Sequence, residues 1–264
     1  MSKTLALTTL IAAVLCSSCS TSPTGRKQLS LVSDQQMTTM GLSAYADMKR
    51  QIPISTDRRK TAYVRCIGNA ITAEVGGNEQ WEITLFDDDQ VNAFALPGGK
   101  IGVYTGLLDV AETPDQLAAV MGHEVAHVLA DHGKARVSAS MAGQAGMLAG
   151  QILLGTQLEG RDRAVMAALG LGLQFGVMMP YGRAQESEAD VLGLELSAKA
   201  GFDPRASTQL WLNMAAASGG APPELLSTHP APDTRIKQLN AQMTRAFATY
   251  RNARASGRTP NCRV

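Results

Sequence analysis

The sequence predicts an α+β fold that is mainly helical, with a small, mostly antiparallel sheet beside one apolar helix. The first reason is helical periodicity over most of the chain after residue 32. The second is a group of three short strand-like runs around the turn Pro97-Gly98-Gly99. The third is the apolar segment Thr113–His132, which carries the run HEVAH. A chain of 264 residues with these features fits one large domain, which we place at residues 33–255.

The N-terminus has the pattern of a lipoprotein signal peptide. Lys3 precedes an apolar run, Leu5–Leu15, that is too short to cross a bilayer. Small residues before Cys19 favour removal of residues 1–18 and lipidation of Cys19, with a plain secretory signal as the alternative. Ser20 follows, where an aspartate would disfavour sorting to the outer membrane. We therefore expect a periplasmic protein anchored to the outer membrane by acyl chains, or a soluble periplasmic one under the alternative.

Composition limits the partners and the covalent links of the mature chain. Ser20–Gln28 is polar, and residues 19–32 are expected to form the lipidated N-terminus and a linker. A net charge of +1 without a basic block argues against nucleic acid as a partner. Cys66 and Cys262 can form a disulfide in an oxidising compartment and so pin the tail at residues 256–264. Two free thiols are the alternative.

The other elements follow in a simple order. Two amphipathic helices and three strands precede the HEVAH segment, and two helices close the chain. Their expected ranges are Ser33–Ile52, Thr56–Val75, Trp81–Asp87, Asn92–Leu96, Lys100–Thr105, Pro204–Ala217 and Pro232–Ala253.

Two segments, Val137–Leu158 and Ala164–Pro180, carry no charged residue and are rich in Gly, Ala and Met. Their hydropathy is borderline for membrane helices, but the charges between them favour a helical hairpin against the rest of the domain. One hypothesis is that this region is mobile and touches substrate or bilayer. Ordinary core helices are the competing interpretation.

The segment Thr113–His132 is expected to be one helix. Thr113 suits the N-cap, Pro114 the first helical position and Gln116 the third position of a capping box. His132 suits the C-terminal end because of the helix dipole, and Gly133 would then stop the helix.

The run HEVAH within this helix has the spacing of a metal site. His123 and His127 are four residues apart, so both imidazoles lie on one helix face and can bind one ion. Glu124 projects close to the same ion and is placed to act as general base on a water molecule. The alternative is a pair of core histidines satisfied by hydrogen bonds. The apolar setting favours the metal, because unpaired buried polar groups are costly.

A catalytic zinc site needs a third protein ligand. His132 does not fit the pattern HExxHxxGxxH, since Ala130 and Gly133 stand where that pattern has glycine and histidine. The acidic run QESEAD opens a later helix, and its Glu186 and Asp190 share a face at positions i and i+4. One carboxylate can bind the metal and the other can orient a histidine, whereas Glu188 is expected to be solvated. An acidic helix N-terminus is the alternative.

HEVAH followed by ESEAD resembles metallopeptidase family forty-eight, the gluzincins that include the CaaX prenyl protease, HtpX and periplasmic lipoproteins. The family pattern is HExxH followed by ExxAD. Three further stretches are similar to the family: Val91–Leu108, Ser227–Ile236 and Tyr181–Arg183, in which Gly182 replaces a serine. The resemblance extends over roughly Ser30–Tyr250.

The resemblance implies a zincin-like catalytic domain with one Zn²⁺ per chain. The metal ligands would be His123, His127 and Glu186, and Asp190 would hold a ligand histidine from the second coordination shell. The family places a strand along its substrate cleft, which here corresponds to Asn92, Ala93, Phe94, Ala95 and Leu96; a buried hairpin is the alternative.

Two more residues take expected roles from the resemblance. His229 would approach the zinc and gate it or assist the transition state, with an ordinary loop histidine as the alternative. Arg183 would support the site through a salt bridge.

The sequence therefore predicts a zinc-dependent endopeptidase of the cell envelope in which Glu124 activates a zinc-bound water. The resemblance implies unfolded, misfolded or stalled outer-membrane polypeptides as substrates, and the outer-membrane assembly machinery as a possible partner. The alternative is a zinc-containing, chaperone-like binding module with latent or no peptidase activity.

Overall fold

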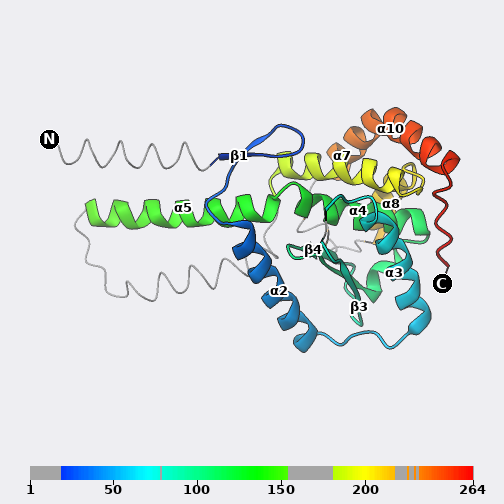
Figure 1. Ribbon diagram of the computed structural model, residues 1–264, viewed down its shortest axis with the longest axis horizontal. Coiled ribbons are helices and arrows are strands. Elements are labelled where there is room, and N and C mark those ends of the chain that lie inside the picture. Colours follow the sequence, from blue (N-terminus) through cyan, green and yellow to red (C-terminus); the bar gives the residue numbers. More distant parts are fainter. Residues whose placement is uncertain are drawn as a thin grey trace. The chain divides into compact units, whose positions relative to one another are not determined.

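The computed structural model describes residues 19–77, 79–153, 181–217, 225, 229 and 232–263. The signal peptide, the segment Ala164–Pro180 and the end of Val137–Leu158 lie outside the described residues. The chain divides into two compact units, one formed by residues 1–37 and 131–178 and the other by residues 38–130 and 179–264 (Figure 1). The second unit contains the HEVAH and ESEAD motifs.

The smaller unit combines a hairpin with a long helix. Strands β1 (Cys19–Thr21) and β2 (Lys27–Leu29) pair antiparallel, with Gly25 at φ 91° in the turn between them. The expected linker therefore contains a hairpin, which its polar composition did not predict. The Ser138 hydroxyl of helix α5 (His132–Leu153) accepts a hydrogen bond from the Leu31 N–H at 2.9 Å. Cys19 is exposed, and its lipidation stays a prediction.

No helix of the described part of the chain is both long enough and apolar enough to cross a membrane. This holds for α5, whose sequence from Ala139 to Leu153 has no charged residue.

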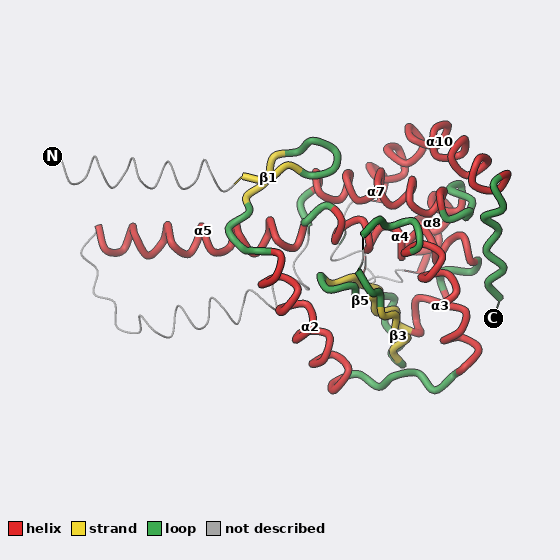
Figure 2. Tube along the Cα trace, in the orientation of Figure 1, coloured by secondary structure: helices red, strands yellow, loops and turns green. Residues whose placement is uncertain are grey.

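The larger unit is mainly helical, and the predicted α+β class is confirmed (Figure 2). Its first helix, α2, begins in the smaller unit. The elements are α2 (Asp34–Gln51), α3 (Arg58–Thr72), β3 (Glu82–Phe86), β4 (Ala93–Leu96), β5 (Lys100–Tyr104), the 3-10 helix η1 (Thr105–Asp109), α4 (Pro114–Leu129), α7 (Arg183–Lys199), α8 (Ala206–Ala217) and α10 (Pro232–Ala255).

Strand β5 is the centre of the three-stranded sheet, whose order is β3-β5-β4. β4 pairs antiparallel with β5 across Gly98 and Gly99, whose φ angles of 88° and 68° favour glycine. β3 instead pairs parallel with β5, with Ile83 opposite Ile101. Two of the three strand pairings among the described residues are therefore antiparallel, and β4 is left at an edge of its sheet.

Helix α4 packs on β4, α3, α7 and α8, so it lies at the centre of the larger unit. The core that surrounds it is formed by side chains from the sheet and these helices. Its fully buried members include Ile67, Ile71, Leu85, Ile101, Leu107, Leu117, Met121, Leu210 and Met214. A disulfide joins Cys66 of α3 to Cys262 of the C-terminal tail.

The predicted beginning of α4 is confirmed, but its predicted end is wrong. The Thr113 hydroxyl accepts from the Gln116 N–H at 3.2 Å, which is an N-cap. The Gln116 side chain accepts from the Glu112 N–H rather than from Thr113. The helix stops at Leu129 because Asp131 takes a left-handed φ of 55°, a conformation that aspartate tolerates better than most residues.

The break at Asp131 gives the next two residues another role. His132 begins α5 instead of ending α4, and Gly133 continues α5 instead of stopping a helix. His132 is fully buried.

Helices α4 and α7 cross at two glycines. A Cβ on Gly193 would lie 2.7 Å from the Cα and N atoms of His123, which is closer than real side chains approach backbone. A Cβ on Gly122 would collide with the Ser197 hydroxyl. The absence of both side chains lets the two backbones approach at the level of His123, and α7 runs beside α4 in Figure 1.

Candidate metal centre

Helix α4 presents the two histidines of HEVAH to one point in the interior. The side chains of His123 and His127 are buried, and their Nε2 atoms lie 3.0 Å apart. Two imidazole nitrogens this close are stable only when a proton or a cation lies between their lone pairs. The i, i+4 spacing read from the sequence thus produces the expected pair.

Helix α7 brings Glu186 to the same point. Its Oε2 lies 3.4 Å from His123 Nε2, and its Oε1 lies 3.5 Å from His127 Nε2. Glu186 is itself buried. The close crossing of α7 and α4 allows a short glutamate side chain to reach both histidines.

His229 completes the cluster from a separate part of the chain. Its Nδ1 lies 2.9 Å from Glu186 Oε1 and 3.3 Å from His123 Nε2. One donor atom from each of His123, His127, Glu186 and His229 lies within 4.8 Å of every other. The structure therefore brings together the three predicted metal ligands and the residue expected to approach the metal.

The chemistry of this donor set fits zinc. Imidazole nitrogen and carboxylate oxygen are common zinc ligands, and a catalytic site of this type uses two histidines and one glutamate. His123, His127 and Glu186 match that set, and His229 is a fourth donor within reach. All four are buried, so a cation would compensate groups that are otherwise held close together away from water.

Glu124 lies beside the cluster without belonging to it. The carboxylate is buried, and its Oε1 forms no hydrogen bond with any described atom. His229 Nε2 lies 3.5 Å from this oxygen. Burial raises the pKa of Glu124, although His229 and His123 act in the opposite direction. A carboxylate whose pKa is raised accepts a proton more readily than an exposed one, as a general base must.

Asp190 lies behind His123, as predicted for a residue of the second coordination shell. Its Oδ1 is 3.1 Å from His123 Nδ1, the ring nitrogen that does not face the other ligands. Burial alone would raise the pKa of Asp190, but Arg235 and His123 hold it below its usual value. An ionised Asp190 orients the His123 ring and favours the tautomer that leaves Nε2 free for a metal.

Arg235 is the main functional residue that the sequence reasoning missed. Its Nε donates to Asp190 Oδ2 at 2.8 Å, its Nη2 donates to Asp190 Oδ1, and its Nη1 lies 3.2 Å from Glu186 Oε2. The guanidinium also lies 3.7 Å from the centre of the Trp211 ring. Arg235 is buried and joins the carboxylates of Glu186 and Asp190. The only indication of Arg235 in the sequence was its position within Ser227–Ile236, one of the stretches similar to the family.

One sequence-based expectation about α7 is wrong. Glu188 is buried rather than solvated, because α7 is enclosed on more than one face. Arg183 stands exposed at the first position of α7, and its support of the site through a salt bridge stays a prediction.

An aromatic ring covers part of the cluster. Tyr181 stacks on His127, with ring centres 3.9 Å apart and an angle of 25° between the planes. Its ring centre is 5.6 Å from that of His229. Tyr181 is half-buried, so it lies between the ligands and the surface.

The strand predicted to bind substrate, β4, lies at an edge of the three-stranded sheet. β4 pairs with β5 on one side only among the described strands, and α4 packs on it. The side chains of Ala93, Phe94 and Leu96 are buried, whereas Asn92 and Ala95 are half-buried. Pairing of a substrate with this strand stays a prediction.

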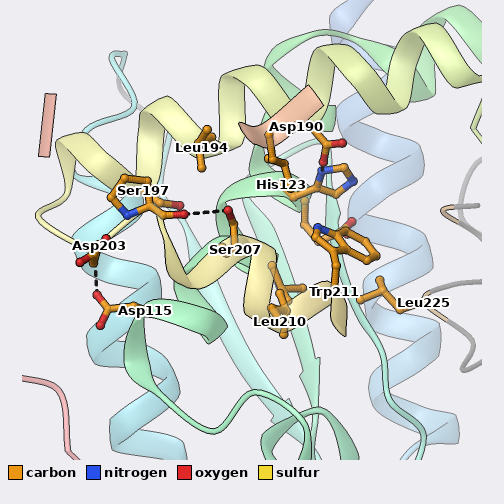
Figure 3. Close-up of a pocket in the computed structure, with 15 residues that line it drawn as sticks. Asp115, His123, Asp190, Leu194, Ser197, Asp203, Ser207, Leu210, Trp211 and Leu225 are labelled. Carbon is orange, nitrogen blue, oxygen red and sulfur yellow. Dashed lines mark hydrogen bonds and ion pairs between the residues drawn. The ribbon is translucent and has the colours of Figure 1, made fainter. Parts of the chain in front are cut away.

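A small cavity adjoins His123 and Glu124 (Figure 3). Its volume is about 20 Å³, which is room for one or two water molecules. Trp211 and Leu225 line it beside His123, and Leu194 and Leu210 extend the apolar wall.

The sequence of this chain is similar to those of known proteins. The family model described as "Peptidase family M48" matches residues 58–243. The mitochondrial metalloendopeptidase OMA1 of Schizosaccharomyces pombe is 34% identical over 208 residues, which cover 78% of this chain and 58% of that protein. OMA1 of Bos taurus is 39% identical over 176 residues, covering 63% of this chain and 33% of that protein.

A bacterial relative is similar over the same region. The beta-barrel assembly-enhancing protease of Yersinia pestis is 30% identical over 210 residues, covering 77% of this chain and 43% of that protein. The chain thus spans between one third and three fifths of the length of these relatives. The family model covers well over half of the chain and includes all the ligands of the cluster. The chain belongs to peptidase family M48.

Proposed function

We propose that the protein is a zinc-dependent endopeptidase of the cell envelope. The observation that carries this proposal is the convergence of His123, His127 and Glu186 next to Glu124, whose buried oxygen has no hydrogen-bond partner among the described atoms. A purely structural metal site would not need a buried carboxylate held free beside it. A hydrolytic site does need one, because a water molecule must lose a proton there.

Each residue then has a defined task. Zinc bound by the three ligands would polarise a peptide carbonyl and make a nearby water more acidic. Glu124 accepts the proton of the attacking water and passes it to the leaving amine, for which its raised pKa is suitable. Asp190 holds His123 in orientation, and Arg235 holds Asp190 and Glu186. His229 can donate a hydrogen bond to the developing oxyanion.

The proposed substrates are unfolded, misfolded or stalled outer-membrane polypeptides. Support comes from the relatives named beta-barrel assembly-enhancing protease and from the lipoprotein pattern that ends at Cys19. An edge strand such as β4 binds extended chains through backbone hydrogen bonds, with little demand on sequence. Such binding suits substrates that share an unfolded state rather than a sequence.

One observation favours a second candidate, a chaperone-like binding module with latent peptidase activity. His229 Nδ1 lies among the other donors and can fill the fourth coordination position that a catalytic zinc leaves to water. In that arrangement the protein would bind envelope polypeptides without cutting them.

The substitution Glu124→Gln tests the proposed function. It keeps the size of the side chain but removes the proton acceptor, so zinc content should stay at one per chain. Cleavage of unfolded casein should fall by about 10²–10⁴-fold. Glu112→Gln is the matched control, because Glu112 is exposed just before the same helix.

Three outcomes separate the candidates. Cleavage by Glu124→Gln at the wild-type rate would refute the peptidase mechanism. A zinc-loaded wild-type protein that prevents aggregation of unfolded polypeptides and cuts none of them would favour the binding module. A protein purified with no zinc and unable to take it up would refute both.

A further inference from the structure

The stacking of Tyr181 on His127 has a geometry that constrains the metal centre. Ring centres 3.9 Å apart at 25° place one ring almost flat on the other, closer than the edge-to-face contacts elsewhere in the cluster. His123 and His127, for comparison, meet at 78° with centres 4.7 Å apart. The face of the His127 imidazole that meets Tyr181 is therefore shielded, while Nε2 stays directed toward the ligand cluster.

The chemistry of the two rings makes this contact depend on the metal. An imidazole that donates its lone pair to a cation becomes electron-poor, and the face of a phenol ring is electron-rich. The attraction between the rings is therefore stronger when His127 is bound to a metal than when it is free. The stack also fixes the torsion of the His127 side chain, so less freedom is lost on metal binding.

Tyr181 also reaches the fourth donor. Its ring centre lies 5.6 Å from that of His229 at an angle of 31°, while the rings of His229 and His127 are 5.1 Å apart. The three rings thus form one group, and Tyr181 is its half-buried member. Loss of the Tyr181 ring would leave His127 and His229 each with one ring contact fewer.

We propose that Tyr181 is a positioning residue of the metal centre: its ring stacks on His127, borders His229, and holds both imidazoles in place for zinc. The inference rests on the proposed function, because it assigns Tyr181 a role at the same zinc site. The ring, rather than the hydroxyl, performs this role, since the contact is made by the ring face. Zinc affinity should depend on an aromatic ring at this position.

The experiment measures zinc binding instead of cleavage. The zinc dissociation constant is determined by competition with a chromogenic chelator for the full-length wild-type protein and for Tyr181→Phe and Tyr181→Leu. Tyr181→Phe should stay within about threefold of wild type. Tyr181→Leu should bind zinc roughly 10–100-fold more weakly, as expected for the loss of a residue that orients a ligand.

A matched control removes an aromatic contact elsewhere in the same unit. Tyr250→Leu deletes the ring that pairs with Phe247 on α10, far in sequence from the ligands, and should leave zinc affinity unchanged. A second readout is the visible absorption of the Co²⁺-loaded protein, which reports ligand geometry. It should change in Tyr181→Leu and be restored in Tyr181→Phe.

Two results would overturn the proposal. One is a zinc affinity in Tyr181→Leu equal to that of wild type. The other is a Tyr181→Phe variant that binds zinc as weakly as Tyr181→Leu, which would assign the role to the hydroxyl. Failure of the proposed function looks different: the wild-type protein would bind zinc, respond to Tyr181→Leu in affinity, and still cut no unfolded polypeptide.

Discussion

The helix pair α4–α7 and the helix pair α8–α10 contribute to the metal centre in different ways. α4 provides the ligands His123 and His127, and α7 provides the ligand Glu186 and its supporting residue Asp190, each pair four residues apart in one helix. α8 and α10 provide Trp211 and Arg235, which contact each other, and Arg235 binds Asp190 and Glu186 from outside the cluster. Arg235 and His123 are 112 residues apart in the chain. The positions of the ligands on α4 and α7 thus follow from residue spacing within a helix, whereas the residues that support the ligands are brought to them only by the tertiary fold.

The largest effect in this comparison is expected from Arg235→Lys. Lysine keeps the charge but cannot make the forked contact with Asp190 and Glu186. The zinc dissociation constant should rise roughly 10–100-fold, because His123 and Glu186 lose their fixed orientation. Competition with a chelator measures this effect.

The control for Arg235→Lys is the same substitution at an exposed pair. Arg205 also binds an aspartate, Asp203, through two guanidinium nitrogens, but its side chain is 64% exposed. Arg205→Lys should leave zinc affinity unchanged. Equal effects of the two substitutions would mean that the buried support from α10 has no special role.

The charge balance of the metal-free site predicts a strong pH dependence of zinc binding. Burial and Arg235 lower the pKa of His123, but hydrogen bonds to Asp190 and Glu186 outweigh them and raise it to about 9. Without metal, the site therefore holds a proton on His123 at neutral pH, and zinc must displace it. Zinc affinity should rise by about tenfold per pH unit between pH 6.5 and 9.

The raised pKa of His123 also makes the stability of the metal-free protein depend on pH. A His123 pKa raised above its unfolded value stabilises the metal-free protein fully below pH 6.5, and this stabilisation is lost as pH rises to about 9. The increase in melting temperature on zinc addition should therefore widen over that range. Asp190→Asn removes a carboxylate that raises this pKa and should flatten the dependence. A wild-type zinc affinity that is constant with pH would contradict the assignment.

The sequence predicted the local part of this site well. The spacing within HEVAH and within ESEAD indicated His123, His127, Glu186 and Asp190, because residues four apart in a helix share a face whatever the rest of the fold does. The N-cap at Thr113 was also predictable, because it depends only on residues within one helical turn. The strand pair around Pro97-Gly98-Gly99 followed from glycines that favour positive φ.

The missed features depend on long-range contacts. Arg235 is one of many charged residues in α10, and no spacing shows that this one is buried. The stack of Tyr181 on His127 joins residues far apart in the chain. The parallel pairing of β3 with β5 and the burial of Glu188 also depend on which elements pack together. The wrong end of α4 has a local cause, since the helix is broken by the left-handed conformation of Asp131 and not at Gly133, where we expected it to stop.

The smallest effect on the metal centre is expected from removal of the disulfide with Cys66→Ser and Cys262→Ser. The bond joins α3 to the tail, and neither cysteine contributes to the ligand cluster. It closes a long loop, with a sequence separation of 196 residues, so its loss should lower the free energy of unfolding by about 2–5 kcal/mol. Zinc affinity and cleavage should stay within about threefold of wild type, since helices α4 and α7 keep their own packing. The tail does pack closely on Gly201, just after α7, and Arg258 pairs with Glu74 at 2.6 Å. A fall in zinc affinity as large as that of Arg235→Lys would therefore mean that the tail holds α7 in place, and that support for the ligands extends beyond α8 and α10.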